Sequence, residues 1–273
     1  MKETVLSANS NGAKALWQSI WKARELLVFL AWRDIVVKYK QAVLGITWAI
    51  LRPILTTMVF TLVFGKIARL PSGEIPYPLL VLSGITPWLY FANTVNDCGN
   101  SLVANSTLIS KVYFPRLVVP ASCVIANLVD LTITVLLLCG MLVWFGIGIR
   151  STIVLVPLVV LALALLTVGL GIWAAALNAR YRDVSFIMPF LVTFGLYLSP
   201  IGFSSGAIPE RWRIVYGLNP VVGLVDGFRF ALFGDQYPFQ MWTLGYSSVL
   251  ALLLIVTGVM YFRHVERDIV DII

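Results

Sequence analysis

Charged side chains are scarce in this sequence. Lys, Arg, Asp and Glu together make up 12% of its 273 residues, whereas 59% of the residues are hydrophobic and the mean hydropathy is +0.91. Soluble domains carry a charge on about a quarter of their residues. The composition therefore excludes an ordinary soluble domain and predicts one membrane domain that folds in lipid.

Cysteine and histidine are also scarce, and a phosphate-binding motif is absent from the sequence. The three cysteines, Cys98, Cys123 and Cys139, form no CxxC pair, and His264 is the single histidine. Disulfides, structural zinc and a catalytic constellation are therefore not expected. The phosphate loop GxxxxGKS/T does not occur in the sequence, so we expect no cofactor on this chain. Energy for any pumping would have to come from another polypeptide or from an ion gradient.

Long apolar runs are what the sequence does contain. A spanning helix needs about 20 residues, and runs suited to that length lie at 44–64, 77–95, 117–146, 153–177, 184–203 and 244–262. We therefore expect an all-α fold of six transmembrane helices. A cytoplasmic segment at 1–43 would precede this domain at 44–262, and a cytoplasmic tail at 263–273 would follow it.

Basic residues indicate the orientation. With the N-terminus inside, Lys and Arg are about twice as frequent in cytoplasmic as in external segments, which agrees with an even number of spans. Residues 1–12 are polar and lack the apolar core of a secretory signal, so we expect the chain to start in the cytoplasm. The net charge of +7 fits anionic lipid headgroups rather than nucleic acid, because no nucleic-acid recognition motif accompanies it.

Three segments are expected to lie at a membrane surface. Apolar residues at helical spacing over 15–31 predict an amphipathic helix in the cytoplasmic interface. Segment 101–114 predicts a short amphipathic helix that either docks on a soluble partner or lies in the interface. Segment 212–233 is apolar but interrupted by Gly217, Asn219 and Pro220. We expect it to form a pair of short helices that dip into the outer leaflet, with a seventh span as the alternative.

Two charges, Arg52 and Asp130, fall inside the predicted spans. A charge at the bilayer centre costs about 2.5–3.5 kcal/mol on insertion scales, so each is expected to face the bundle interior, a partner or water. They could line a polar path or relay protons. Alternatively, Arg52 snorkels or pairs internally, while Asn127 and Thr134 satisfy Asp130.

Aromatic side chains are abundant in the predicted spans. Their flat apolar faces can stack on the C–H faces of sugars, so a channel lined by them would let a glycan slide; the alternative is packing or lipid contact. The candidates for lining a channel, including the two charges, are Trp48, Arg52, Phe60, Trp88, Tyr90, Phe91, Asp130, Phe194 and Tyr197.

From about Arg33 to the C-terminus, motifs in sequence order resemble the permease subunits of ABC exporters for O-antigen, capsule and teichoic acid. These motifs are Arg33-Asp34 with Lys38-Tyr39-Lys40; Leu44-Gly45 with Trp48 and Pro53; Asn105, Leu108-Ile109, Lys111 and Phe114-Pro115-Arg116; Asn178 with Arg180-Tyr181-Arg182-Asp183-Val184; Pro189 and Ser199-Pro200; Asn219-Pro220 with Phe228-Arg229; and Glu266, Asp271 and Ile272.

The resemblance implies a homodimer in the bacterial inner membrane, with six helices per half around a channel and two separate ATPase subunits that bind ATP and Mg. It implies export of a glycan on a polyprenyl diphosphate or similar lipid, as in lipopolysaccharide biosynthesis. The implied ATPase-coupling residues are Asn105, Leu108, Ile109, Lys111, Phe114, Arg180, Arg182 and Asp183. The implied outer-gate residues are Asn219, Pro220, Asp226, Phe228 and Arg229.

Three other functions compete with this one. An ABC exporter of drugs or small lipids would share the architecture. A proton-coupled secondary transporter would use Asp130 and need no ATPase, so co-purification of an ATPase discriminates between the two classes. A membrane-bound glycosyltransferase or acyltransferase would need an acid, histidine and metal constellation that the sequence lacks.

Overall fold

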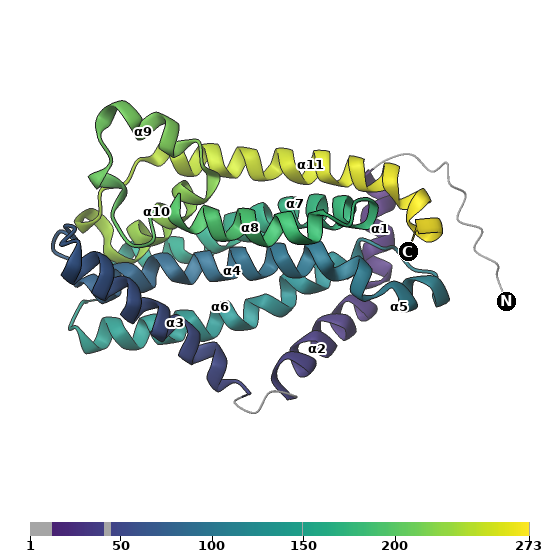
Figure 1. Cartoon of the computed structure of the whole chain (residues 1–273), viewed down its shortest axis with the longest axis horizontal. Coiled ribbons are helices and arrows are strands. Elements are labelled where there is room, and N and C mark those ends of the chain that lie inside the picture. Colours follow the sequence, from purple (N-terminus) through teal and green to yellow (C-terminus); the bar gives the residue numbers. More distant parts are fainter. Residues whose placement is uncertain (1–12, 41–44, 149, 273) are drawn as a thin grey trace.

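The computed structural model describes residues 13–40, 45–148 and 150–272, and every regular element in these ranges is a helix. The expectations for residues 1–12 and for a first span that starts at Leu44 fall outside the described residues, as do those for the side chains of Asp271 and Ile272. The long helices run side by side along the longest axis of the molecule (Figure 1).

The elements follow one another in the order α1 (Ala13–Lys22), α2 (Arg24–Lys40), α3 (Thr47–Phe60), the π-helix η1 (Thr61–Ile67), α4 (Tyr77–Ala104), α5 (Ser106–Lys111), α6 (Val118–Trp144), the 3₁₀-helix η2 (Ser151–Leu155), α7 (Val156–Arg180), α8 (Val184–Tyr197), the 3₁₀-helix η3 (Ser205–Ala207), α9 (Glu210–Gly217), α10 (Pro220–Phe233), the 3₁₀-helix η4 (Gly234–Gln236) and α11 (Met241–Ile272).

The described helices confirm the predicted all-α fold class. Four of them are long and apolar enough to cross a bilayer: Thr47–Ile67, Val118–Trp144, Ser151–Arg180 and Met241–Glu266. The other two predicted spans correspond to α4, which has 28 residues but polar side chains along its length, and to α8, which has 14. The count of six spans therefore stays a prediction.

Three predicted boundaries are corrected. The predicted helix over 15–31 is divided into α1 and α2, and α2 continues to Lys40, where Lys38 and Tyr39 contact Asp130 on α6. The second predicted span continues to Ala104, so the predicted helix at 101–114 is reduced to the short α5. The fifth predicted span ends at Tyr197 instead of residue 203, just before Pro200, which disfavours helix in the residue preceding it.

Helix α4 forms the centre of the bundle. It packs against α6, α7, α3, α10 and α8, and its buried residues run from Leu79 to Leu102. Small residues allow neighbouring helices to approach closely. A Cβ atom on Gly169 of α7 would lie 3.0 Å from the backbone nitrogen of Ile255, so this glycine permits α7 and α11 to pack backbone to backbone.

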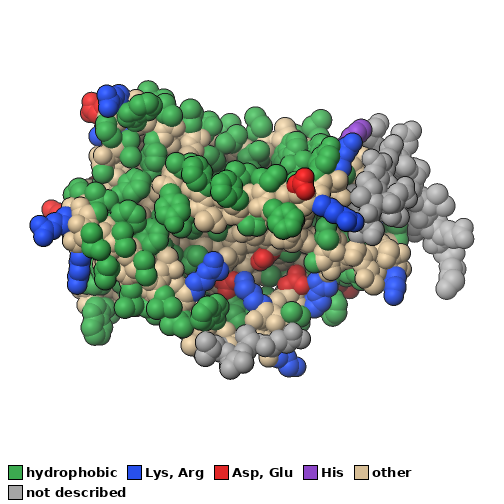
Figure 2. Space-filling view, in the orientation of Figure 1, with side chains coloured by type: hydrophobic (Ala, Val, Ile, Leu, Met, Phe, Trp, Pro, Cys, Tyr) green, Lys and Arg blue, Asp and Glu red, His purple; other side chains and the backbone are tan. Residues whose placement is uncertain are grey.

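The two ends of the bundle differ. Helices α1 and α5 and the end of α11 lie at one end, which we call the α5 end, and α9 and α10 lie at the other, which we call the α9 end (Figure 1). Figure 2 shows hydrophobic side chains along the flanks, with charged side chains at the ends and in one patch below the middle. An apolar flank between charged ends is the arrangement expected of a protein in a bilayer.

Candidate functional site

A charged network joins the end of α2 to the bundle. Lys38 Nζ forms an ion pair with Asp130 Oδ2 on α6, and the Tyr39 hydroxyl donates to Asp130 Oδ1. Lys38 also donates to Asn127 Oδ1 at 3.1 Å, and Asn127 Nδ2 donates to Asp97 Oδ2 on α4 at 2.8 Å. We call these five residues the α2 junction. It ties α2 to two bundle helices through groups that lipid would not solvate.

The partners predicted for Asp130 are wrong. Its carboxylate is bound by Lys38 and Tyr39 rather than by Asn127 and Thr134. The Thr134 hydroxyl donates to the Asp130 backbone carbonyl at 2.8 Å, which leaves the carboxylate untouched. The physical reason is that α2 extends to Lys40 and packs on α6, which brings a cation beside this carboxylate.

The Tyr39 hydroxyl stays protonated and so remains a hydrogen-bond donor in this network. Burial raises the pKa of Tyr39, and the hydrogen bond to the Asp130 carboxylate raises this pKa further. A tyrosine whose pKa lies above its usual value near 10 stays protonated across the physiological range. Its proton therefore remains available to Asp130 while Lys38 balances the charge.

A small cavity of about 100 Å³, with charged residues among a mostly apolar lining, opens beside the α2 junction, between α2, α3, α4 and α6. Arg52 and Asp130, the two charges predicted within spans, both line it. Arg52 is exposed, and its Nη1 donates to Asn93 Oδ1 on α4 at 3.2 Å. The cavity therefore gathers charges of both signs beside Trp48, which is 52% exposed.

Three of the predicted channel-lining aromatics lie inside the bundle. Trp88, Tyr90 and Phe91 of α4 are 5%, 1% and 8% exposed, and the first and third of these rings pack at 5.4 Å. They contribute to the core of a single chain. Of the span aromatics considered from the sequence, the exposed ones lie on α3 and α8: Trp48, Phe190, Phe194 and Tyr197. Phe60 is half-buried against Phe64, with their ring centroids 5.3 Å apart.

At the α9 end, a buried arginine ties α10 to other segments. Arg229 is 0% exposed and donates to the carbonyl oxygens of Leu80 at 2.9 Å, Ile201 at 3.0 Å and Phe203 at 3.1 Å. It also donates to Ser83 Oγ at 3.3 Å. These acceptors belong to α4 and to the chain after α8, so one guanidinium joins three parts of the fold.

A tyrosine hydroxyl connects Arg229 to the neighbouring carboxyl group of Asp226. Arg229 Nη1 donates to the Tyr237 hydroxyl at 3.1 Å, and that hydroxyl donates to Asp226 Oδ1 at 2.6 Å. Burial raises the pKa of Tyr237, and the neighbouring Asp226 adds to this, so the tyrosine keeps its proton. Phe228, which is 1% exposed, packs in the apolar core of the same end. We call Arg229, Tyr237 and Asp226 the α10 network.

The start of α10 is capped locally. The Asn219 side-chain oxygen accepts from the backbone N–H of Val221 at 3.1 Å, and Pro220 occupies the first helical position. Asn219 Nδ2 donates to the Leu198 carbonyl at 3.2 Å and to Ser199 Oγ at 3.3 Å. An N-cap asparagine followed by proline fixes where a helix begins. The predicted outer-gate residues thus lie together at one end of the bundle.

The predicted coupling residues meet at the α5 end. Ile109 is buried in one apolar cluster with Ala179 of α7, and Leu108 and Phe114 pack against this cluster. The Asn105 amide donates to the Ser101 carbonyl at 2.8 Å and helps to end α4. Four of the predicted residues remain exposed: Lys111, Arg180, Arg182 and Asp183. Tyr113, which sequence reasoning did not single out, is 87% exposed beside them in the chain.

This arrangement can be compared with known proteins. The family model described as "ABC-2 type transporter" matches residues 25–233, which is more than half of the chain. The chain belongs to the ABC-2 type transporter family. This finding confirms the resemblance drawn from the sequence motifs.

Relatives of this ABC-2 type transporter align over most of their length. The O-antigen export system permease protein RfbA of Klebsiella pneumoniae is 26% identical over 253 residues, which cover 91% of this chain and 95% of that protein. A protein of the same description from Myxococcus xanthus is 27% identical over 226 residues (82% and 86%). The polysialic acid transport protein KpsM of Escherichia coli is 24% identical over 240 residues (86% and 91%).

The range that matches the ABC-2 family contains all of the α2 junction and most of the α10 network. It begins within α2 and ends with α10. Sequence reasoning missed Lys38 and Asp97 as partners in the junction, and Tyr237 in the α10 network. The sequence did contain one indication of the Lys38–Asp130 pair. Because this ABC-2 transporter has few charged residues, an acid inside a predicted span has few cations with which it can pair.

The ion pair of the α2 junction should contribute measurably to stability. Asp130→Asn removes the charge that faces Lys38 and leaves the tyrosine with a weaker acceptor. Because the Lys38 side chain is 42% exposed and that of Asp130 16%, we expect a loss of about 1–3 kcal/mol rather than the larger cost of a fully buried pair. Thermal unfolding of the purified ABC-2 transporter in detergent measures it.

The chain offers a matched control for this substitution. Glu210 pairs with Arg213 at 3.6 Å, but its side chain is 89% exposed, so Glu210→Gln should leave the unfolding midpoint unchanged. The double variant Lys38→Met/Asp130→Leu should recover part of the loss, since it removes both charges together. Equal midpoints for Asp130→Asn and Glu210→Gln would contradict a stabilising role for the junction.

Proposed function

We propose that the chain is the permease subunit of an ATP-driven exporter that moves lipid-linked polysaccharide across the bacterial inner membrane. The observation that carries this proposal is the alignment, over most of their length, with two O-antigen export permeases and a polysialic acid transport protein. The substrate would be a glycan on a polyprenyl-type lipid, delivered from the cytoplasmic side.

The proposed topology has six spans with both ends in the cytoplasm. Helices α4 and α8 would be the second and fifth spans, because they lie alongside the four apolar helices in the bundle (Figure 1). The α5 end would then be cytoplasmic and the α9 end external. Helices α9 and α10 would serve as an outer gate, held in place by Asn219 and the α10 network.

Power would come from partner subunits. The sequence has no phosphate-binding loop, and ATP with Mg would be bound by two separate ATPase subunits. The exposed cations Lys111, Arg180 and Arg182, with Tyr113, form the surface of the α5 end that we propose as their docking site. Ile109 and Phe114 would transmit movements of the ATPase subunits to the helix bundle, because they anchor this surface in the apolar cluster beneath it.

The pathway would form between two copies of the chain. Arg52 and Trp48 of α3 are exposed, and a lipid-facing position would not suit the arginine. The exposed rings of Phe190, Phe194 and Tyr197 lie on α8. A homodimer that brings together the exposed faces of α3 and α8 would enclose these aromatic and polar groups in a channel wide enough for a glycan.

Export in cells tests this proposal. Cells that lack the gene should accumulate lipid-linked glycan on the cytoplasmic side of the membrane. Cells that carry Lys111→Glu or Arg182→Glu should show the same accumulation, because charge reversal at the docking surface should separate ATP hydrolysis from export. Both sides of the membrane can be measured with a glycan-specific antibody on intact and on permeabilised cells.

The control for charge reversal is Arg69→Glu, an exposed cation in the segment between η1 and α4, outside both the docking surface and the proposed gate. It should leave export intact while Lys111→Glu and Arg182→Glu abolish it, with all three proteins inserted in equal amounts. Normal export by both variants of the α5 end would remove the docking assignment. Normal export in the deletion strain would remove the proposed function itself.

A further inference from the structure

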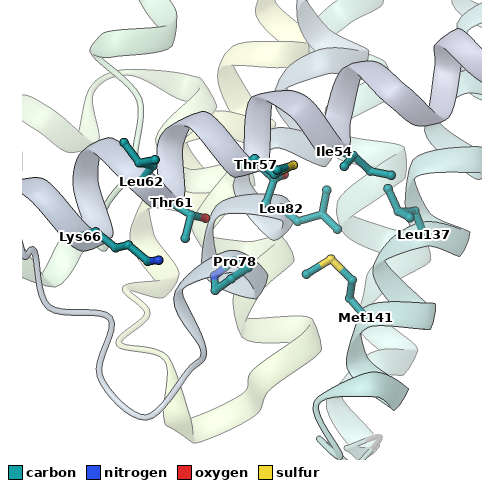
Figure 3. Close-up of a pocket in the computed structure, with 10 residues that line it drawn as sticks. Ile54, Thr57, Thr61, Leu62, Lys66, Pro78, Leu82, Leu137 and Met141 are labelled. Atoms are coloured by element: carbon teal, nitrogen blue, oxygen red, sulfur yellow. The ribbon is translucent and has the colours of Figure 1, made fainter.

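A cavity of about 320 Å³ lies between the first span, α4 and α6. Its volume is within the range of about 300–1,000 Å³ that is typical of ligand pockets. Figure 3 shows Leu62, Thr61 and Lys66 toward one side and Leu137 and Met141 toward the other. The full lining is Ile54, Thr57, Met58, Thr61, Leu62, Lys66, Pro78, Leu82, Leu137 and Met141.

The wall of this cavity is an irregular helix. The first span changes from α-helix to the π-helix η1 at Thr61, and the backbone N–H of Ala68 bonds to the Val63 carbonyl, five residues back, at 2.8 Å. Gly65 allows the widened turn to rest on Tyr77, whose ring would lie 2.9 Å from a Cβ at this position. Single π-turns in α-helices frequently mark functional sites.

Two hydroxyl groups in the cavity lack partners. Within the described parts of the chain, Thr57 Oγ1 and Thr61 Oγ1 are buried and have no hydrogen-bond partner, and Thr57 is only 5% exposed. Buried polar atoms are nearly always paired, because leaving one unpaired costs free energy. Both threonines line the cavity. Its occupant should therefore offer hydrogen-bond acceptors to this wall.

A cation lies at the end of the same wall. Lys66 is exposed and forms no ion pair among the residues that the structure describes. It is near the end of the first span, where long basic side chains reach the headgroup region. Along the first span the mostly apolar lining thus begins at Ile54, includes the two threonines with Met58 and Leu62 beside them, and ends at Lys66.

We infer that this cavity binds one glycerophospholipid. An acyl chain would lie among Ile54, Leu137 and Met141, an ester carbonyl would accept from the threonine hydroxyls, and the phosphate would pair with Lys66. This order of apolar, hydrogen-bonding and cationic groups matches the order of groups along the lipid. A polyprenyl diphosphate has no ester carbonyl, so its phosphate oxygens would have to accept from both threonine hydroxyls as well as pair with Lys66. The inference rests on the proposed function only in assigning the bound lipid to the outer leaflet, because that assignment uses the proposed topology.

Native mass spectrometry with dimyristoyl phosphatidylglycerol tests the site on the full chain in detergent. We expect one retained lipid per chain, about fivefold weaker binding in Lys66→Gln, and loss of the retained lipid in Met141→Trp, whose ring fills the cavity. Arg69→Gln, a nearby exposed cation outside the lining, and Met260→Trp, on an exposed face of α11, are the controls. Equal retention in all four variants would overturn the site.

The ester group allows a second, independent measurement. Ether-linked phosphatidylglycerol lacks the carbonyl oxygens, so the unmodified chain should bind it about fivefold more weakly than the ester lipid. Thr57→Val/Thr61→Val should bind the two lipids equally. The same ester preference in this variant would overturn the hydrogen-bond assignment.

Competition separates the possible occupants. Glycerol phosphate should not displace the bound lipid, because the acyl chain contributes most of the contact. Displacement of phosphatidylglycerol by polyprenyl phosphate at equal concentration would overturn the inference in favour of the substrate carrier. Loss of the dimer in Met141→Trp would overturn it in favour of a second copy of the chain. None of these binding measurements requires export, so a failure of the proposed lipid site can be distinguished from a failure of the proposed function.

Discussion

Replacement of Arg229 by methionine is expected to destabilise the protein by about 3–5 kcal/mol, the cost of removing one partner from a buried charge network. The guanidinium is 0% exposed and supplies hydrogen bonds to three backbone carbonyls, to Ser83 and to Tyr237. Methionine fills a similar space but donates nothing. The carbonyls of Ile201 and Phe203 would lose their arginine donor within an interior that excludes water, and the Leu80 carbonyl would keep only its other donors, such as the Ser83 hydroxyl.

The loss extends to Asp226. Its carboxylate accepts from Tyr237, whose oxygen in turn accepts from Arg229. Without the guanidinium, a 4% exposed carboxylate would face no described cation in this network. An unpaired buried charge is costly, so α10 should lose its fixed position against α4 before the rest of the bundle unfolds.

Thermal unfolding in detergent measures the effect of Arg229→Met, and Arg229→Lys serves as a matched variant. Lysine keeps the charge but cannot reproduce the planar fork of donors, so its midpoint should fall between those of Arg229→Met and the unmodified protein. Arg213→Met on α9, a less buried arginine whose Nε donates to the Ile208 carbonyl at 3.1 Å, should have a much smaller effect. A midpoint for Arg229→Met equal to that for Arg213→Met would contradict the expected role.

The sequence was sufficient to predict helices where apolar residues run long enough. The predicted span at 117–146 corresponds closely to α6 (Val118–Trp144), and the one at 44–64 overlaps Thr47–Ile67. These helices are specified locally, because a run of about 20 apolar residues has few alternatives in lipid. The two short helices predicted within 212–233 are also present as α9 and α10, since Asn219 and Pro220 mark the break between them.

Other boundaries depend on contacts that hydropathy does not record. Helix α4 continues beyond residue 95 to Ala104 because its polar face binds neighbours: Asp97 accepts from Asn127, and the Gly99 carbonyl accepts from Asn178 of α7. The π-helix at Thr61–Ile67 has no hydrophobic signature either. It depends on Gly65 resting against Tyr77, a contact across a turn of the chain.

The candidate site was the least predictable part, because its members are distant in sequence. Lys38 and Asp130 are 92 residues apart, and Arg229 and the Leu80 carbonyl are 149 residues apart. Asp130 stood out as a charge inside a predicted span, and Arg229 belonged to one of the family motifs. Only the packing of α2 on α6 and of α10 on α4 brings their partners beside them.

The second large effect is expected at Gly223, where α10 crosses α11. A Cβ at this position would lie 2.3 Å from the backbone oxygen of Thr243 and 2.6 Å from Ser247 Oγ. Because one of these neighbours is backbone, Gly223→Ala must push the two helices apart, and overpacking of this kind costs about 1–3 kcal/mol. The helix-propensity gain of alanine, about 1 kcal/mol, offsets only part of that cost.

Gly227, one turn later on the same helix, separates packing from propensity. A Cβ there would meet only side-chain atoms, the nearest being Leu244 Cδ1 at 3.3 Å and Leu244 Cδ2 at 3.5 Å, and the leucine can move. Gly227→Ala should therefore be neutral or raise the unfolding midpoint, whereas Gly223→Ala should lower it. A difference of this sign would indicate that α10 is held against α11 by backbone contact, so that any gating motion of α10 requires α11 to move with it or the glycine contact to open.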